Sequence, residues 1–286
     1  MTSSSPDLEL HPGDPRYPGA LEDCPVPPRT LWARGDLAIL DRPTVAIVGT
    51  RRATAYAERV TRQLASTLAR AGACVISGLA RGVDVAAHRA ALDVEGATCA
   101  VLGTGLDVTY PKGHAAIQQD IGARGLLLSE LPPSLAAHGG SFPRRNRIIA
   151  ALARVTIVVE AGVKSGALIT ASHALELNRT VAAVPGPIDI PQAQGSNELL
   201  RDGACLIASV ADALALLGLT APVRLRDLPA EGSERALWDA LAAGHADLDT
   251  LSSRAGLPAH EALAAVSALE LRGLVECALS GEIRRL

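Results

Sequence analysis

The sequence predicts an α/β protein with an open, mainly parallel sheet, followed by a small winged-helix-like domain at the C-terminal end. Two observations lead to this fold class. Short apolar runs alternate with amphipathic helical stretches from Val45 to Ile207, which is the pattern of strand-helix-strand units. A stretch containing Pro and Gly at 219–232 then separates this part from a shorter unit with helical patterns.

The predicted strands are short apolar runs of the kind that is buried on both faces of a sheet. In chain order they are Val45–Val48, Cys74–Ile76, Thr98–Leu102, Leu126–Leu128, Val155–Val159, Val181–Val184 and Cys205–Ile207. Between the first two runs, Val60, Leu64 and Leu68 recur every four residues, as they would on one face of a helix. Strands separated by a helix in this way pair in parallel.

Turns containing Gly and Ser follow several of the predicted strands. The first strand is followed by Gly49–Thr54, the second by Ser77-Gly78, and the fifth by a turn with Lys164-Ser165-Gly166. In a parallel sheet these turns share one edge, which is where open α/β sheets bind ligands. Backbone at Gly and Ser can approach a phosphate closely, and helix N-termini at this edge attract anions.

The C-terminal unit has the pattern of a winged helix, namely three helical stretches and a hairpin in a short length of chain. The helical stretches are Ser233–Ala243, Leu248–Ala255 and Pro258–Arg272, and Glu276–Leu286 is expected to form a hairpin around Ser280-Gly281.

These patterns set the expected domain boundaries. Residues 1–13 are expected to be an N-terminal tail, 14–218 the α/β domain, 219–232 a linker and 233–286 the winged-helix-like domain.

Composition limits the classes of protein to which the chain can belong. The formal net charge of -3 at pH 7 argues against a surface coated in positive charge, so any nucleic-acid site must be local. No apolar run approaches the roughly 18 residues of a membrane span, and Met1–Pro15 lacks the pattern of a signal peptide. We therefore expect a cytoplasmic protein without a membrane partner.

The five cysteines do not form a metal-binding or disulfide pattern. They are widely spaced, and no CxxC or zinc-type spacing with His occurs. Cys74, Cys99 and Cys205 lie in predicted strands, where Cys acts as a small core residue. We expect a reducing compartment and no bound metal.

A basic and aromatic cluster at Ser141–Arg147 is the most informative segment of the sequence. It combines three arginines with Phe142, the only phenylalanine of the chain. Guanidinium groups grip phosphates, and a ring offers a face on which a base can stack. The cluster therefore favours binding of unpaired nucleic acid. The alternative is an ordinary helix start, with solvated arginines and the ring in the core.

The turn Gly49–Thr54 stands where a dinucleotide-binding turn would stand, but its pattern differs. Arg51 occupies the position at which GxGxxG requires a second Gly, which argues against NAD. The turn instead suits a phosphate held by a guanidinium and by a helix N-terminus that Thr54 caps. The alternative is that Arg51 and Arg52 are surface residues of a tight turn. We expect no cofactor.

Lys112 and Lys164 are the only lysines of the chain, and each follows a predicted strand. A P-loop sequence is absent, so neither belongs to a motor or kinase motif. Both remain candidates for contact with a phosphate, and the alternative for each is a plain exposed turn.

Four acidic or imidazole side chains could in principle support chemistry. Asp84 and His88 are four residues apart, which places them on one face of a helix, and Glu130 and Glu160 follow predicted strands. No nucleophile and base accompany them in the sequence pattern, so capping or salt bridging is the favoured role. We expect no catalytic residues and a protein that is not an enzyme.

Together the motifs resemble the DprA/Smf family of bacterial DNA-processing proteins. The similarity runs from Tyr17-Pro18 to about Ile207, and the order and spacing of the motifs make it specific. The motifs are Val45–Arg51, Ser77–Asp84 with Ala87-His88, Tyr110-Pro111-Lys112, Phe142–Ile149, Val159-Glu160-Ala161 with Ser165-Gly166, and Val184-Pro185-Gly186.

The resemblance implies an extended Rossmann-like domain that binds single-stranded DNA, forms a homodimer and interacts with RecA. Such a protein would help to load RecA onto single strands in natural transformation and recombination. The family's pocket residues carry over onto Arg51, Lys112 and Phe142–Arg147. With the turns described above, the candidate DNA-binding residues are Gly49, Thr50, Arg51, Arg52, Thr54, Gly78, Lys112, Phe142, Arg144, Arg145, Asn146, Arg147, Lys164, Ser165 and Gly166.

Two other functions remain as alternatives. A nucleotide phosphoribohydrolase of the lysine-decarboxylase-like group carries a Pro-Gly-Gly-x-Gly-Thr-x-x-Glu turn, whereas this chain has Glu160–Gly166, which lacks a counterpart of the catalytic Glu. A transcription factor would read duplex through the helix Pro258–Arg272, but that helix carries Glu261 and Glu270 and no basic residue before Arg272. For the C-terminal unit, contact with a protein or a scaffold role is favoured over recognition of duplex DNA.

Overall fold

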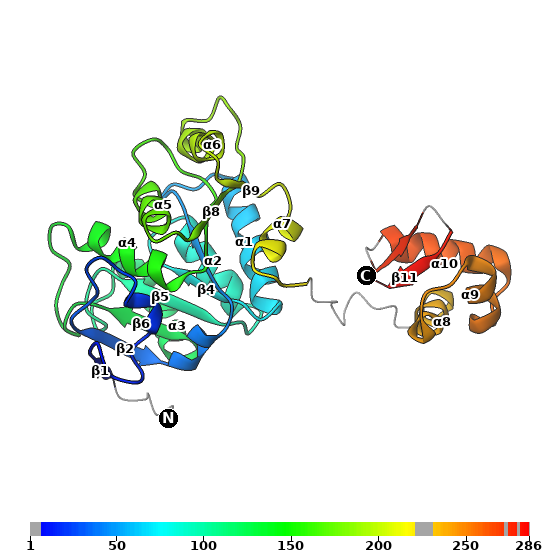
Figure 1. The fold of residues 1–286 in the computed structure, drawn as a ribbon, viewed down its shortest axis with the longest axis horizontal. Coiled ribbons are helices and arrows are strands. Elements are labelled where there is room, and N and C mark those ends of the chain that lie inside the picture. Colours follow the sequence, from blue (N-terminus) through cyan, green and yellow to red (C-terminus); the bar gives the residue numbers. More distant parts are fainter. Residues whose placement is uncertain (1–6, 221–230, 272–273, 279–280, 286) are drawn as a thin grey trace. The chain divides into compact units, whose positions relative to one another are not determined.

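The fold is taken from a computed structural model, which describes residues 7–220, 231–271, 274–278 and 281–285. The chain divides into two compact units, residues 1–221 and residues 222–286, each of which is described by itself (Figure 1). Most of the linker expected at 219–232 lies outside the described residues.

The first unit is built on one nine-stranded sheet with the order β1-β2-β6-β5-β4-β3-β7-β8-β9. From β6 to β9 all neighbouring strands are parallel, and β2 and β1 add an antiparallel edge. The strands are β1 (Leu8–Leu10), β2 (Leu31–Gly35), β3 (Thr44–Val48), β4 (Cys74–Ser77), β5 (Thr98–Leu102), β6 (Leu126–Ser129), β7 (Val155–Val158), β8 (Thr180–Ala183) and β9 (Cys205–Leu206).

The predicted open, mainly parallel sheet is therefore confirmed, and each apolar run from Val45 onward coincides with a strand. The pattern did not predict β1 and β2. Strand β1 lies within the expected tail 1–13, and its residues pair with β2 from Leu8 opposite Ala33 to Leu10 opposite Leu31. β1 is the edge strand and β2 lies next to it, and neither contains a β-branched residue.

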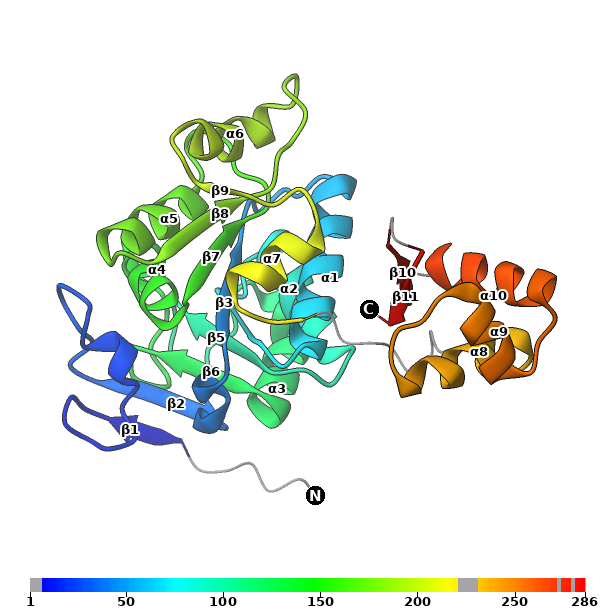
Figure 2. The ribbon, with the colours of Figure 1, turned by 45° about the vertical axis from the view of Figure 1, so that its right-hand side comes forward.

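Helices cover both faces of the sheet (Figure 2). They are α1 (Ala55–Arg70), α2 (Val83–Leu92), α3 (Ala115–Arg124), α4 (Ser141–Leu152), α5 (Gly166–Glu176), α6 (Gln194–Arg201) and α7 (Val210–Leu216). Alternate residues of β3 divide between the two cores, since Val45 and Ile47 pack with α1 and α2 whereas Ala46 and Val48 pack with α4 and α5.

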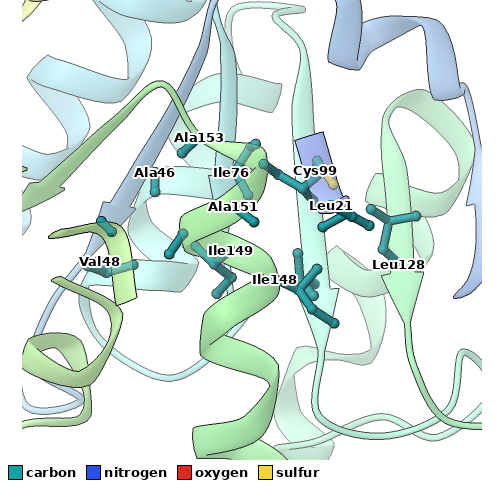
Figure 3. Packing of buried hydrophobic residues seen from close by; sticks show 14 of the residues in the cluster. Leu21, Ala46, Val48, Ile76, Cys99, Leu128, Ile148, Ile149, Ala151 and Ala153 are labelled. Atoms are coloured by element: carbon teal, nitrogen blue, oxygen red, sulfur yellow. The ribbon is translucent and has the colours of Figure 1, made fainter. Parts of the chain in front are cut away.

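Helix α4 carries the basic and aromatic cluster, and its second half is anchored in the core. Ile148 and Ile149 are buried and lie over Ala46, Ile76 and Cys99 of the central strands (Figure 3). The sheet therefore fixes the position of the residues at the start of the helix.

The prediction that Cys205 is a core residue is wrong. Cys74 and Cys99 are buried, as expected, but Cys205 is exposed. It lies in β9, a strand of two residues that has a partner, β8, on only one side. The helices that bury the central strands do not cover this edge at Cys205.

The second unit has the expected winged-helix arrangement. Its helices are α8 (Ser233–Ala240), α9 (Leu248–Ala255) and α10 (Ala259–Leu271), and β10 (Val275–Cys277) pairs antiparallel with β11 (Ile283–Arg285). Leu237, Leu251 and Leu269 are fully buried in its separate core. None of the helices in the described part of either unit combines the length and apolar character needed to cross a membrane.

Candidate nucleic-acid interface

The turns at the carboxyl ends of β3, β4 and β7 surround a cavity of about 610 Å³ in the first unit. It lies where the parallel sheet was expected to bind its ligand. The cavity brings together ten of the candidate residues, namely Gly49, Thr50, Arg51, Arg52, Phe142, Arg145, Asn146, Lys164, Ser165 and Gly166.

A smaller cavity of about 230 Å³ adjoins the first. The two share lining residues that include Arg51, Phe142 and Arg145, and Gly78 lines only the smaller one. The remaining candidates, Thr54, Lys112, Arg144 and Arg147, line neither cavity.

The turn after β3 is held by Glu160, at the end of β7. The Thr50 backbone N–H donates to the Glu160 carbonyl at 2.6 Å. The Glu160 carboxylate accepts from the Thr54 backbone N–H at 3.0 Å and from the Thr54 hydroxyl at 2.7 Å. Thr54 in turn accepts from the Ala57 N–H and caps α1, as predicted. Glu160 and Thr54 thus hold the Gly49–Arg52 turn open toward the cavity.

An aromatic and cationic row crosses the boundary between the cavities. The Arg51 guanidinium lies 5.7 Å from the centre of the Phe142 ring, and the Tyr110 ring centre lies 5.0 Å from that of Phe142. A Cβ at position 103 would overlap the Phe142 ring, so Gly103 allows the ring to lie directly on the strand end. Arg51 and Tyr110 are both exposed, so the row can be reached from solvent.

Arg145 is buried, unlike the other arginines of the cavity walls. Its Nη1 donates to the Val101 carbonyl, and its guanidinium occupies the space in which a Cβ of residue 78 would lie. Its Nε is buried and has no hydrogen-bond partner. Burial lowers the pKa of Arg145 to about 10, while Asp84 acts in the opposite direction. Arg145 remains charged at neutral pH and forms part of the fixed floor of both cavities.

Asp84 is the buried counter-charge of Arg145. Burial raises the pKa of this carboxyl, and the positive charge of Arg145 opposes the shift. The Asp84 Oδ2 accepts from the backbone N–H groups of Gly78 at 3.2 Å and Ala80 at 3.4 Å. Asp84 therefore fixes the loop after β4. His88, one turn further along α2, is buried, and burial lowers its pKa to about 3, so it is uncharged at neutral pH.

Arg144 and Arg147 point to Glu130 rather than into a cavity. The Glu130 Oε1 lies 2.9 Å from Arg144 Nη2 and 2.8 Å from Arg147 Nη2. Arg147 is buried and also donates from Nε to the Val26 carbonyl at 2.9 Å. Of the three arginines in the segment, two therefore form a salt-bridge network with Glu130. The capping or salt-bridging role expected for Glu130 and Glu160 is confirmed.

The turn into α5 forms another part of the wall of the larger cavity. Ser165 caps α5 by accepting from the Ala167 N–H at 3.3 Å. Asn146 donates to the Gly166 carbonyl at 3.1 Å, which joins this turn to α4. Lys164 is exposed on this turn and supplies a positive charge to the larger cavity.

Lys112 is exposed just beyond the smaller cavity. The two residues before it, Tyr110 and Pro111, line that cavity, but Lys112 does not. After Lys112 the chain packs back against the loop that follows β4, because His114 Nδ1 lies 3.0 Å from the Leu79 carbonyl oxygen. Lys112 therefore stands at the rim and can meet only a ligand that extends out of the cavity.

The cavities are also lined by residues that were not among the candidate DNA-binding residues. Arg81 and Pro111 line the smaller cavity, and Asp84, Val163, Ile169 and Gln192 line the larger one. Arg81 is three residues after the strand-end Gly78, and nothing in the local sequence distinguishes it from other turn arginines. Gln192 precedes α6, which no turn motif connected with the site. Among the described residues, no cluster of His, Cys, Asp or Glu could hold a metal ion.

The winged-helix unit offers little free positive charge. Arg284 pairs with Glu276 on the opposite strand at 2.6 Å, and Arg235 pairs with Asp239. Arg285 lies over the Trp238 ring at 4.2 Å and donates to the Trp238 carbonyl. The larger cavity of the first unit, by contrast, is lined by Arg51, Arg52 and Lys164, which are exposed.

An open, mainly parallel sheet with a cationic cavity at its carboxyl edge, joined to a winged helix, defines a class of nucleic-acid-processing protein. The family model for DNA recombination-mediator protein A matches residues 9–218, and the model for the DprA winged helix domain matches residues 220–281. The chain belongs to the DprA/Smf family.

Its relatives include Protein Smf of Escherichia coli, which is 37% identical over 98% of this chain and 78% of that protein. The putative DNA processing protein DprA of Mycobacterium tuberculosis is 42% identical over 89% of this chain and 68% of that protein. The X-ray structure of DprA from Streptococcus pneumoniae superposes with a TM-score of 0.70 at 41% identity, covering 73% of each chain.

A second solved relative is DNA processing protein A from Helicobacter pylori, with a TM-score of 0.68 and 35% identity over 76% of this chain and 98% of that one. That structure was reported for its single-stranded DNA binding mode. These relatives do not favour the phosphoribohydrolase alternative.

The Glu130 network predicts how stability responds to acid. Burial raises the pKa of the Glu130 carboxyl, but the hydrogen bond and charge of Arg147, with those of Arg144, outweigh burial and lower it. The network therefore stabilises the fold above the ordinary glutamate pKa of about 4.3, and this contribution is lost as pH falls below it. Arg147→Ala should lower the free energy of unfolding by about 1–3 kcal/mol at pH 7 and by less near pH 3.

Urea unfolding at the two pH values measures this difference, with Arg62→Ala, an exposed arginine of α1, as the control. An equal loss of stability at both pH values would contradict the role of Glu130.

Gly78 should be required because of Arg145. A Cβ at position 78 would overlap the buried guanidinium, so Gly78→Ala must displace it. Overpacking of this kind costs about 1–3 kcal/mol. Thermal or urea unfolding checks the loss against Gly139→Ala, where a Cβ would meet no atom within 4 Å. Equal stability of the two variants would show that the guanidinium has room to move.

Proposed function

We propose that this protein binds single-stranded DNA at the two cavities and acts as a recombination mediator that helps to load RecA onto single strands. In this proposal it works in the cytoplasm during natural transformation and recombination, as a homodimer and without catalysis. Its family membership and the single-stranded DNA binding mode reported for the Helicobacter pylori relative support the assignment.

One observation carries the proposal. Arg51, Arg52 and Lys164 are exposed on the cavity walls, and no carboxylate pairs with any of them among the described residues. A guanidinium or ammonium in this situation can neutralise a phosphate without first breaking an ion pair. The confined site explains how a chain with a net charge of -3 can hold a polyanion.

The aromatic row supports an unpaired strand over a duplex. A base can stack on an aromatic ring only when the face of the base is free, and each such stack contributes about 1–3 kcal/mol. The exposed Arg51 lies against Phe142, and the Tyr110 ring lies against Phe142 as well, so phosphate and base contacts are available together. In a duplex the base faces are covered by their neighbours.

The proposed contacts divide the candidate residues by their position. Arg51, Arg52 and Lys164 would hold phosphates, with Lys112 at the rim for a strand that leaves the cavity. Backbone at Gly49, Thr50, Ser165 and Gly166 would approach the strand. The supporting residues are Thr54, Gly78, Arg144, Arg145, Asn146 and Arg147.

Binding of labelled oligo-dT, followed by fluorescence anisotropy, tests the site. Arg51→Ala should weaken binding about tenfold or more, because a hydrogen bond to a charged group contributes about 1.5–3 kcal/mol. The slope of log affinity against log salt should fall by about 0.7 for each phosphate contact removed. Lys112→Ala should have a smaller effect with long strands and none with short ones.

Arg62→Ala, which removes an exposed arginine away from the cavities, serves as the control and should bind as the wild type does. If both Arg51→Ala and Lys112→Ala bound oligo-dT with unchanged affinity, the assignment of the DNA site to these cavities would be wrong. Equal affinity of the wild type for duplex would remove the preference for single strands.

Assembly of RecA on protein-coated single strands tests the mediator role. The wild type should shorten the lag before RecA filaments form, compared with RecA alone. Arg51→Ala should give the lag of RecA alone, because this variant no longer holds the strand. Light scattering of the full chain measures whether it is a dimer. A wild type that binds oligo-dT and leaves the lag unchanged would limit the function to binding.

A further inference from the structure

The smaller cavity has its own set of walls. It shares Arg51, Arg52 and Phe142 with the larger cavity, while Arg81 and Tyr110 line the smaller cavity alone. Its 230 Å³ is several times the roughly 30 Å³ that one water occupies in the liquid. The space is therefore too large for a single ion and suits part of a larger ligand.

The smaller cavity is strongly cationic. Arg51, Arg52, Arg81 and Arg145 line it, and none of its described lining residues is acidic. Asp84, which offsets the charge of Arg145, lines only the larger cavity. Arg81 is exposed and makes no ion pair in the described part of the chain. The ligand of this cavity must carry negative charge.

The smaller cavity also offers a ring. Tyr110 is 52% exposed, although its ring also contacts the ring of Phe142. Its free face is available to a flat partner, and base-aromatic stacking suits this geometry. Negative charge and a flat ring system together describe a nucleotide.

The floor between the cavities is fixed before any ligand arrives. The Arg145 guanidinium is held against Gly78 and by the Val101 carbonyl, and the loop after β4 is held by Asp84. Arg51 and Phe142 line both cavities, and the Arg51 guanidinium lies 5.7 Å from the centre of the Phe142 ring. A ligand in one cavity is therefore adjacent to a ligand in the other, and both can contact these two side chains.

We propose that the smaller cavity is a second nucleotide site, which takes the neighbour of the nucleotide held in the larger cavity. The phosphate lies against Arg81 and the base against Tyr110, while Arg51 and Phe142 separate successive nucleotides. This inference rests on the proposed binding of single strands; it adds Arg81 as a phosphate-binding residue and assigns Tyr110 to the base of the second nucleotide.

Competition against labelled oligo-dT tests the second site with the full chain. The competitors are thymidine monophosphate, which fills one site, and the dinucleotide pTpT, which spans both. The wild type should bind pTpT about tenfold more tightly than the monophosphate. Arg81→Ala and Tyr110→Ala should each remove most of this advantage and leave the affinity for the monophosphate within twofold of that of the wild type.

Two matched variants complete the experiment. Arg89→Ala removes another exposed arginine, from the last turn of α2, and should keep the full advantage of pTpT. Lys164→Ala affects the larger cavity alone and should weaken both competitors equally. Arg81→Ala should also reduce the salt slope for pTpT by about 0.7, as expected for a lost phosphate contact.

The outcomes separate this inference from the proposed function. If the wild type fails to bind oligo-dT, the proposed function fails. If it binds oligo-dT but pTpT competes no better than the monophosphate, the second site is excluded. The same follows if Arg81→Ala retains the advantage in the way that Arg89→Ala does.

Discussion

The candidate interface depends on the buried positive charge of Arg145. Arg145 can remain at the floor of both cavities only because residue 78 has no side chain, Val101 offers a carbonyl and Asp84 supplies a counter-charge. A buried ion without such partners is strongly destabilising. The sheet therefore has to bring α2, α4 and the ends of β4 and β5 together before the cavities exist.

The arginines of Phe142–Arg147 show how one cluster divides its charges. Arg144 and Arg147 neutralise Glu130, whereas Arg145 is buried beneath the cavities. The exposed, unpaired charges come instead from Arg51 and the turn containing Lys164. The cluster thus builds the site more than it touches the ligand, and the only side chain of the segment in the aromatic row is Phe142.

Much of the fold followed from the sequence, because inner parallel strands are continuous apolar runs and their turns carry Gly and Ser. Strands β1 and β2 were not predicted because they are short and mix apolar with polar residues. For the site, the place of the Gly and Ser turns at strand ends predicted where the cavity lies. The sequence pattern did not predict which side chains pair with one another there. Glu130 is 14 and 17 residues from the two arginines with which it pairs. Arg81 resembles any other turn arginine in the sequence, and only the fold shows that it lines the same cavity as Tyr110.

The two tryptophans have a practical consequence. Trp32 lies in β2 opposite Ser129, and Trp238 lies in the core of the winged-helix unit beneath Arg285. Each compact unit therefore contains one tryptophan, and neither residue lines either of the two cavities described above. When one indole is replaced by Phe, the emission of the other reports on its own unit, so the melting of each unit can be assigned to its own half of the chain.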